Sequence, residues 1–382
     1  MNEKIWSVSG ALLVSVALSA CGGGGGGGSG SGGGGTGGSG GSGTPELVDG
    51  ELRFENETDN FKNYQNPDAD ARQDACDRSD YYLESDNFMV YVDTGQTYSK
   101  DDLRTAATKA QNAMDAILPR FGMTWSDFYA MKRIISFSDI DQFAIEASQL
   151  GLPTSELAQY FPGIPDGTET EQQAFIYNAL VDEETPANVR TTIDTFIADN
   201  SSETSPLTAI TPIHDKIQIC ATTSDRIARS STSGLKIAPS YSDENYRHES
   251  THLIINQVSK FPAFWALEGQ THLILEGGPA SVEDVASIRN SIIGTDESEP
   301  GRENINRFKE AYLALSARTN NDIGKVMDWH RDSMKIKAEW LTTNDGTSII
   351  ISDDERIAGV KEAFGIVMGF GYDEFFDDLS NP

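Results

Sequence analysis

Short apolar runs bounded by polar and turn-forming residues predict the strands of this chain. Four runs are rich in Val, Ile, Phe or Tyr and have the length of a strand, and they cover residues 87–93, 133–137, 216–220 and 234–239. A further run at 348–351 fits either a strand or a buried turn. The sheet is therefore expected to form mainly from the earlier part of the sequence.

Helical periodicity dominates the rest of the chain. Ser99 is a suitable N-cap for an amphipathic helix that continues to about Leu118. Helical patterns alternate with Pro and Gly breaks from about residue 139 to 205, and from Tyr246 onward the pattern is almost entirely helical. Strands followed by helices predict an α+β fold. Its expected parts are a subdomain with a mixed sheet at 87–278 and a mostly helical C-terminal subdomain at 279–382.

The first 21 residues resemble the signal peptide of a bacterial lipoprotein. Lys4 precedes an apolar run of about a dozen residues, which is too short for a comfortable transmembrane helix and ends in small residues before Cys21. The resemblance implies removal of residues 1–20, acylation of Cys21 and a lipid bilayer as partner. It also implies a place in the bacterial cell envelope, at the outer membrane if the host is Gram-negative, with periplasmic and surface exposure both open. A plain secretory signal or an uncleaved anchor is the alternative interpretation.

A tether and an acidic arm connect this signal to the globular part. The segment 21–44 that begins with the cysteine is almost entirely Gly and Ser, so we expect a flexible leash with a root-mean-square reach on the order of 25 Å. The arm at 45–86 is polar and acidic, and its aspartates at 68–80 are spaced somewhat like those of a calcium loop. Calcium is disfavoured because Arg72 replaces a third acidic ligand and the loop glycine is missing.

Charge and cysteine content narrow the function classes. The 59 Asp and Glu against 29 Lys and Arg give a net charge of −30, which argues against nucleic acid as a partner, because binding phosphates needs a basic face. Three cysteines are too few for a fold built on disulfides. In an oxidising compartment we expect Cys76 and Cys220 to form a disulfide. The alternative is two free cysteines, with Cys220 facing the core.

The segment 248–252 reads HESTH and matches the motif H-E-x-x-H. His248 and His252 lie four residues apart, so on a helix they share one face about 6 Å apart along the axis and can bind one zinc ion per chain. Glu249 is offset around the helix, and in such sites its carboxylate acts as the general base on a metal-bound water. A helix with incidental histidines is the alternative.

A catalytic zinc needs a third protein ligand. Pro262 is expected to end the helix of the motif, and the run that begins at Trp265 starts another. If the chain reverses between the two helices, Glu268 comes level with His252 and is the favoured third ligand. His272, four residues later on the same face, is expected to lie in the second shell or in the cleft, and Trp265 in the core.

Together these residues resemble the gluzincin metallopeptidases of the peptidase MA type, which carry HExxH, a turn with proline and a WxxEG helix. The matching residues are His248, Glu249, His252, Pro262, Trp265, Glu268 and Gly269. The resemblance implies a zincin-like fold, zinc bound by both histidines and Glu268, and Glu249 as catalytic acid and base. It also implies that the strand at 234–239 is an edge strand that lines the cleft. The polar run 270–272 departs from the family, which usually has small or apolar residues there.

The expected function is a membrane-tethered zinc peptidase that acts on a peptide or protein substrate. Such an enzyme usually has a second group that stabilises the oxyanion, and the candidates are Tyr312, His330 and Tyr372. His330 equally fits a histidine on a helix surface, held by its acidic neighbours. One alternative function is a non-catalytic, zinc-binding lipoprotein that serves in binding or assembly. Zinc-dependent hydrolysis of a bond other than a peptide bond is another.

Overall fold

A computed structural model describes eleven stretches of the chain, which together hold a small mixed sheet and many helices. The described residues are 48–51, 81–93, 96–133, 135–182, 186–201, 215–224, 228–260, 262–276, 285–292, 302–344 and 349–380. The signal, the tether with Cys21 and most of the acidic arm lie outside these stretches, so the expectations for them stay predictions. None of the helices in the described part is long and apolar enough to cross a membrane.

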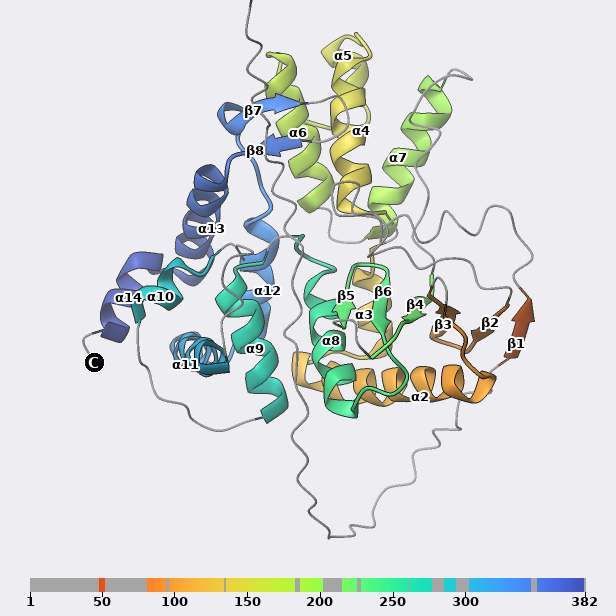
Figure 1. Ribbon diagram of the computed structural model, residues 1–382. Helices are drawn as coiled ribbons and strands as arrows, with labels where there is room; N and C mark the ends of the chain where they lie inside the picture. Colours follow the sequence, from red (N-terminus) through yellow and green to blue (C-terminus); the bar gives the residue numbers. More distant parts are fainter. Residues whose placement is uncertain are drawn as a thin grey trace, which may run out of the picture.

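The sheet has six strands in the order β1-β2-β3-β4-β6-β5 (Figure 1). Their bounds are Val48–Glu51 for β1, Tyr81–Glu84 for β2, Phe88–Val92 for β3, Ile217–Ala221 for β4, Arg229–Ser230 for β5 and Gly234–Ile237 for β6. The central strands β3, β4 and β6 are parallel, whereas β1, β2 and β5 join antiparallel. This topology confirms the strands predicted at 87–93, 216–220 and 234–239, and the fold is compatible with the α+β class.

One strand expectation and one position in the sheet need correction. The run 133–137 does not form a strand, because the Ser136 side chain accepts a hydrogen bond from the backbone of Asp139 and starts helix α4, Phe137–Gln149. The backbone N–H of Arg133 is bonded to the side chain of Gln257 rather than to a neighbouring strand. The strand at 234–239 is not at the edge, because the two-residue strand β5 pairs along its outer side.

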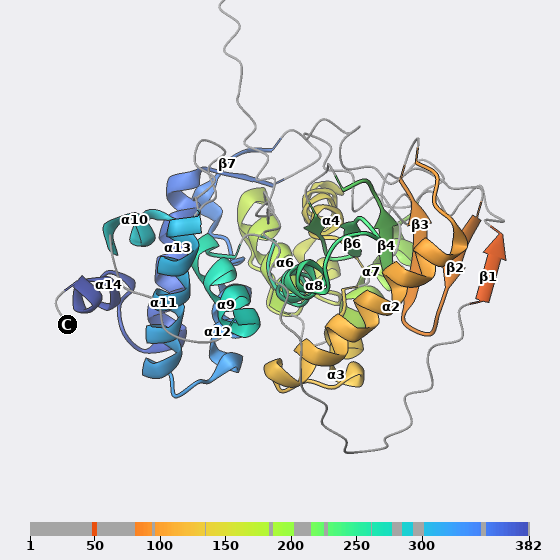
Figure 2. The same ribbon diagram turned by 60° about the horizontal axis from the view of Figure 1, so that its bottom comes forward.

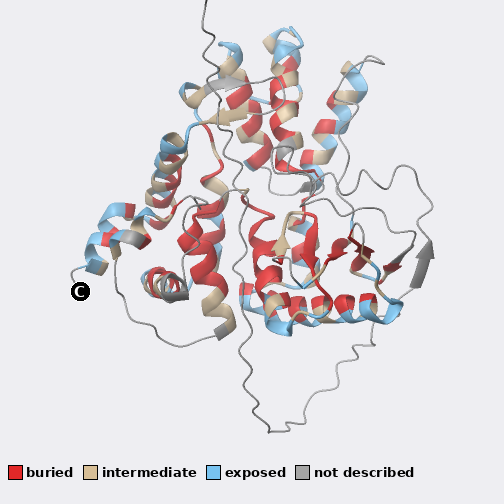
Figure 3. Cartoon of the chain, viewed as in Figure 1, coloured by how far each residue is buried: buried red, intermediate tan, exposed pale blue. Residues whose placement is uncertain are grey.

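Helices α2 (Lys100–Ile117) and α8 (Asp243–Ile255) pack on one face of the sheet and form the first core (Figures 1 and 3). Ser99 caps α2 as predicted, in a capping box with Asp102. The face of α2 that meets the sheet is rich in alanine, which allows a close approach of helix and strands. Val90 and Ile219 point into this core from neighbouring strands.

The remaining helices form two further cores beside the sheet (Figure 2). The second core contains α4, α5 (Thr154–Leu157), α6 (Glu169–Asp182) and α7 (Pro186–Asn200). The third contains α9 (Phe264–Glu276), α10 (Val285–Asn290), α11 (Arg302–Arg318), α12 (Ile323–Asp332), α13 (Asp353–Met368) and α14 (Tyr372–Ser380). The connecting elements are η2 (Leu118–Phe121), α3 (Trp125–Met131), η4 (Ala338–Trp340), and a hairpin of β7 (Leu341–Asn344) with β8 (Ile349–Ile351). Within the run at 348–351, Ile349–Ile351 thus forms a strand.

Helix α9 belongs to two of these cores at once. Its Leu267 packs in the first core with the sheet, whereas its Trp265 is fully buried in the third core among the C-terminal helices. Gly269 lets α9 approach α11 closely, because an added Cβ would collide with the backbone carbonyl of Phe308. The helix that carries Glu268 is therefore held from both sides.

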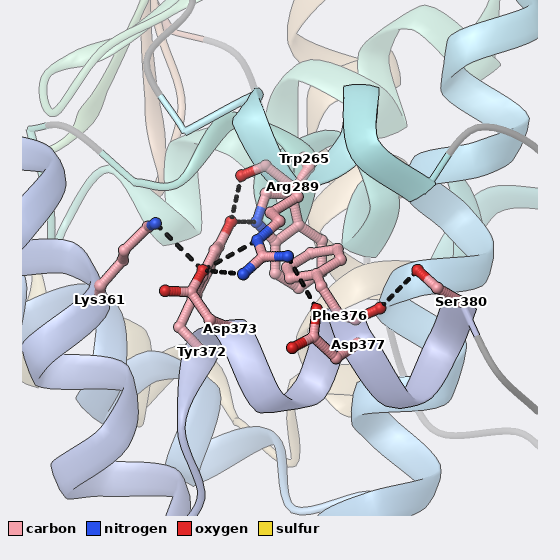
Figure 4. Close-up of polar contacts among 8 residues, drawn as sticks. All are labelled: Trp265, Arg289, Lys361, Tyr372, Asp373, Phe376, Asp377 and Ser380. Carbon is pink, nitrogen blue, oxygen red and sulfur yellow. Dashed lines mark hydrogen bonds and ion pairs between the residues drawn. The ribbon is translucent and has the colours of Figure 1, made fainter.

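The last helix, α14, is fastened to α9 and α10 by the contacts drawn in Figure 4. The Tyr372 hydroxyl accepts a hydrogen bond from Trp265 Nε1 at 2.9 Å and donates one to the backbone oxygen of Arg289 at 3.0 Å. The Arg289 guanidinium in turn pairs with Asp373 at 2.7 Å and with Asp377 at 2.9 Å. This arrangement links the C-terminal helix to α9 one turn before Glu268.

Replacing Tyr372 with Phe should lower the free energy of unfolding by about 1–3 kcal/mol, because Trp265 Nε1 then lacks an acceptor inside a dry core. Chemical denaturation of the full chain measures this. Tyr160→Phe is the matched control: the Tyr160 hydroxyl donates to Asp199 at the surface, where water can replace the bond, so we expect a much smaller loss. Equal losses in the two variants would contradict the assignment.

Candidate metal centre

Two consecutive helices, α8 and α9, carry the predicted metal ligands and lie side by side (Figures 1 and 2). Helix α8 begins after Ser242, whose side chain accepts a hydrogen bond from a backbone N–H of the first turn, and it ends at Ile255. It ends well before Pro262, so the expectation that this proline terminates it is wrong. The chain then reverses into α9 and brings Glu268 beside His252, as the helix geometry predicted.

The side chains of His248, His252 and Glu268 converge on one point. The two Nε2 atoms of the histidines lie 2.8 Å apart. Glu268 Oε1 lies 3.4 Å from His252 Nε2, and Glu268 Oε2 lies 3.8 Å from His248 Nε2. A tetrahedral ion with bonds of about 2.0–2.1 Å holds its ligand atoms about 3.3 Å apart. The observed distances lie on both sides of that value, so this buried group could hold a metal ion.

Burial keeps both imidazoles of this group neutral. Burial, followed by the nearby His272, lowers the pKa of His248 to about 3. The pKa of His252 also lies well below its ordinary value, first because of burial and then because of His248 and His272. A neutral imidazole nitrogen is the form that binds a metal ion. Nδ1 of His252 is buried and has no hydrogen-bond partner among the described residues.

Glu249 lies next to this group and is itself only 2% exposed. Burial, and then the charge of Glu268, raises its pKa to about 8, whereas a hydrogen bond from Ser230 and the charge of Arg229 act in the opposite direction. Its Oε2 is buried and has no hydrogen-bond partner in the described part of the chain. In its ionised form, a carboxyl group with a raised pKa and one open oxygen can take up a proton from a neighbouring water.

His272 lies at the cluster, as a residue of the second shell or the cleft should. Its Nε2 is 3.8 Å from Glu268 Oε2, and its ring centroid is 5.3 Å from that of His248. It stands one helical turn beyond Glu268 on α9. Its side chain is more exposed than those of the three converging residues, at 14%.

The three candidates for oxyanion stabilisation have different surroundings. Tyr372 lies in the contact between α14 and α9, where its hydroxyl makes two structural hydrogen bonds, so we do not assign it to the site. Tyr312 is buried on α11 where that helix passes Gly269, and burial raises its pKa. Among the described residues, no hydrogen bond joins Tyr312 to His248 or His252.

His330 is fully buried on α12, so the interpretation as a surface histidine is wrong. Its ring is stacked beside that of Trp329, with 5.1 Å between the centroids. Neither ring nitrogen has a hydrogen-bond partner within the described stretches, and burial lowers the pKa to about 3. His330 therefore stays neutral in the folded protein at neutral pH.

Sequence reasoning missed the two residues of β5, Arg229 and Ser230, which act on Glu249. The Ser230 hydroxyl also accepts a hydrogen bond from Asn256 Nδ2 at 3.3 Å, and this bond joins the edge strand to the end of α8. A strand of two residues has no readable alternation of apolar and polar positions. No signal in the sequence could therefore have placed these residues beside Glu249.

The structure describes one of the two cysteines that were expected to form a disulfide. Cys220 lies in β4, is fully buried and is disulfide-bonded. The two other cysteines, Cys21 and Cys76, both lie outside the described residues. The pairing of Cys220 with Cys76 therefore stays a prediction.

Comparisons with known proteins found no match. None of the protein-family models matches the chain, no curated protein matches it, and neither does any solved structure. The function must therefore be inferred from the site itself.

The burial of His330 predicts a loss of stability in acid. Its pKa is about 3 in the folded state and 6.5 in the unfolded state, so between these pH values only the unfolded chain takes up the proton. This contribution to stability is intact above pH 6.5 and should fall by about 2 kcal/mol on going to pH 5.

Comparison with the variant His330→Phe isolates the contribution of His330 to the pH dependence of stability, because all other titratable groups are present in both proteins. We expect the unfolding free energy of the wild type, minus that of the variant, to decrease by about 2 kcal/mol between pH 7.5 and pH 5 in urea denaturation. A difference that does not change with pH would show that the ring is solvated or paired.

Proposed function

We propose that this chain is a zinc-dependent peptidase of the gluzincin type, with a zincin-like fold. The observation that carries the proposal is the convergence of His248, His252 and Glu268 in a buried position beside Glu249. Imidazole and carboxylate donors in this number suit a catalytic zinc, because three protein ligands leave a fourth position for water or substrate. The two helices involved are those that carry HESTH and WALEG.

Each residue then has a defined task. His248, His252 and Glu268 would hold the ion, which lowers the pKa of a bound water to about 7 and polarises the substrate carbonyl. Glu249 accepts the proton of the attacking water through its open oxygen and passes it to the leaving amine. The Ser230 hydroxyl and the Arg229 charge stabilise the ionised form of Glu249 and so favour its action as a base.

The state of Glu249 favours catalysis over a purely structural zinc site. A structural site needs only its ligands, whereas here a further carboxylate is buried next to them without a partner for one oxygen in the described part of the chain. Such burial is costly, and a binding module could dispense with it. A non-catalytic lipoprotein that binds zinc is the second candidate, and hydrolysis of a bond other than a peptide bond is the third.

The location proposed for this peptidase is the bacterial cell envelope. The signal-like segment 1–20 and Cys21 support an acyl anchor, and the Gly- and Ser-rich tether would hold the folded part within a few tens of ångströms of the bilayer. Peptides or unfolded proteins of that compartment are the proposed substrates.

Metal analysis and a cleavage assay on the full chain test the proposal. We expect about one zinc per chain, and loss of that zinc in His252→Ala. Glu249→Gln should retain zinc but lower the cleavage rate of an unfolded protein such as casein by at least about 100-fold, because it removes the general base.

The matched control is Glu244→Gln, which changes an exposed glutamate in the first turn of the same helix and should leave both zinc content and cleavage unchanged. Zinc binding without cleavage of any peptide substrate by the wild type would favour the second or third candidate. A wild-type protein that binds no zinc would refute the proposal.

A further inference from the structure

The side chains of the candidate metal centre differ in how deeply they are buried. The side chain of Glu268 is 2% exposed and that of His252 is 7% exposed, whereas that of His248 reaches 10%. The most exposed member of the cluster, His272, packs its ring against His248 in an edge-on contact. These two rings are therefore the least buried part of the cluster.

His272 approaches the cluster without joining the group of converging donors. Its Nε2 is 3.8 Å from Glu268 Oε2, the same oxygen that lies 3.8 Å from His248 Nε2. In the described residues, the donors that all lie within 4.8 Å of one another are those of His248, His252 and Glu268, and His272 is not part of that set. The imidazole thus stands beside the coordination group, with its Nε2 buried.

The two neighbours of His272 in the polar run 270–272 have fully buried side chains. The Thr271 hydroxyl donates to the backbone oxygen of Leu267 at 2.8 Å and is fully buried. Gln270 is also fully buried. Within this run, His272 is the residue that contacts the cluster, and its side chain is 14% exposed.

We propose that His272 binds the external ligand of the centre, an anion or the carbonyl oxygen of a substrate, by donating a hydrogen bond from its imidazole. This inference rests on the proposed function, because it presupposes an ion held by the three converging residues. It makes His272 a residue that contacts substrate rather than a fourth ligand. The distinction matters, since four protein ligands would close the site, as in structural zinc centres.

Binding of azide to the cobalt-loaded full chain tests the inference independently of activity. Cobalt(II) replaces zinc in such sites, and its visible absorption reports both metal binding and the arrival of an anion. In His272→Ala we expect the affinity for azide to fall at least tenfold, because the hydrogen bond to the anion is lost. The affinity for cobalt should fall far less than in His248→Ala, since the coordinating donors are intact.

Two further variants make the result specific. His272→Gln keeps an N–H donor near the same place and should recover part of the azide affinity. Leu273→Ala truncates the next residue of α9, which packs against the C-terminal helical core, and should leave azide affinity unchanged.

The outcomes separate the two proposals. Unchanged azide affinity in His272→Ala would overturn the role of His272 alone. A loss of cobalt affinity as large as that of His248→Ala would also overturn it, by making His272 a ligand. A wild-type chain that binds neither cobalt nor zinc would overturn the proposed function and this inference together.

Discussion

The structure depends on holding His248 and His252 of α8 against Glu268 of α9 in the buried interior. Polar groups buried in this way cost free energy unless they find partners. The two histidines and the glutamate are partners for one another at mutual distances of 2.8–3.8 Å, and the group could also hold a metal ion. The position of α9 relative to α8 therefore decides whether these three side chains can converge.

Contacts from separate parts of the chain fix that position. Tyr372 of the C-terminal helix holds Trp265, one turn before Glu268. The turn between α8 and α9 is held by Lys260, which pairs at 3.5 Å with the buried carboxylate of Asp141 on α4. Removing either contact would leave a buried polar group unsatisfied, which costs more than the contact itself contributes. The helices beside the sheet therefore help to position the candidate metal centre, although Glu268 is the one converging donor that they supply.

Local chemistry was predictable from the sequence, and long-range pairing was not. The N-cap at Ser99 and the HESTH motif each depend on neighbouring residues of a single helix. The position of Glu268 was predicted by counting residues along two helices joined by a turn. The strand expected at 133–137 failed because an apolar run has no intrinsic preference strong enough to outweigh the N-cap of Ser136. The burial of His330 and the contact of Ser230 with Glu249 depend on elements distant in sequence, which periodicity cannot place.

Because the converging donors come from helices of different cores, an ion bound by them would act as a cross-link. His248 and His252 lie on a helix of the sheet core, and Glu268 lies on the helix that also packs among the C-terminal helices. Binding to the folded state alone adds to its stability in proportion to the logarithm of the ion concentration over the dissociation constant. The same ion would also relieve the repulsion between Glu249 and Glu268, which raises the pKa of Glu249. In the proposed enzyme, binding of the ion and the charge of Glu249 would thus be coupled through Glu268.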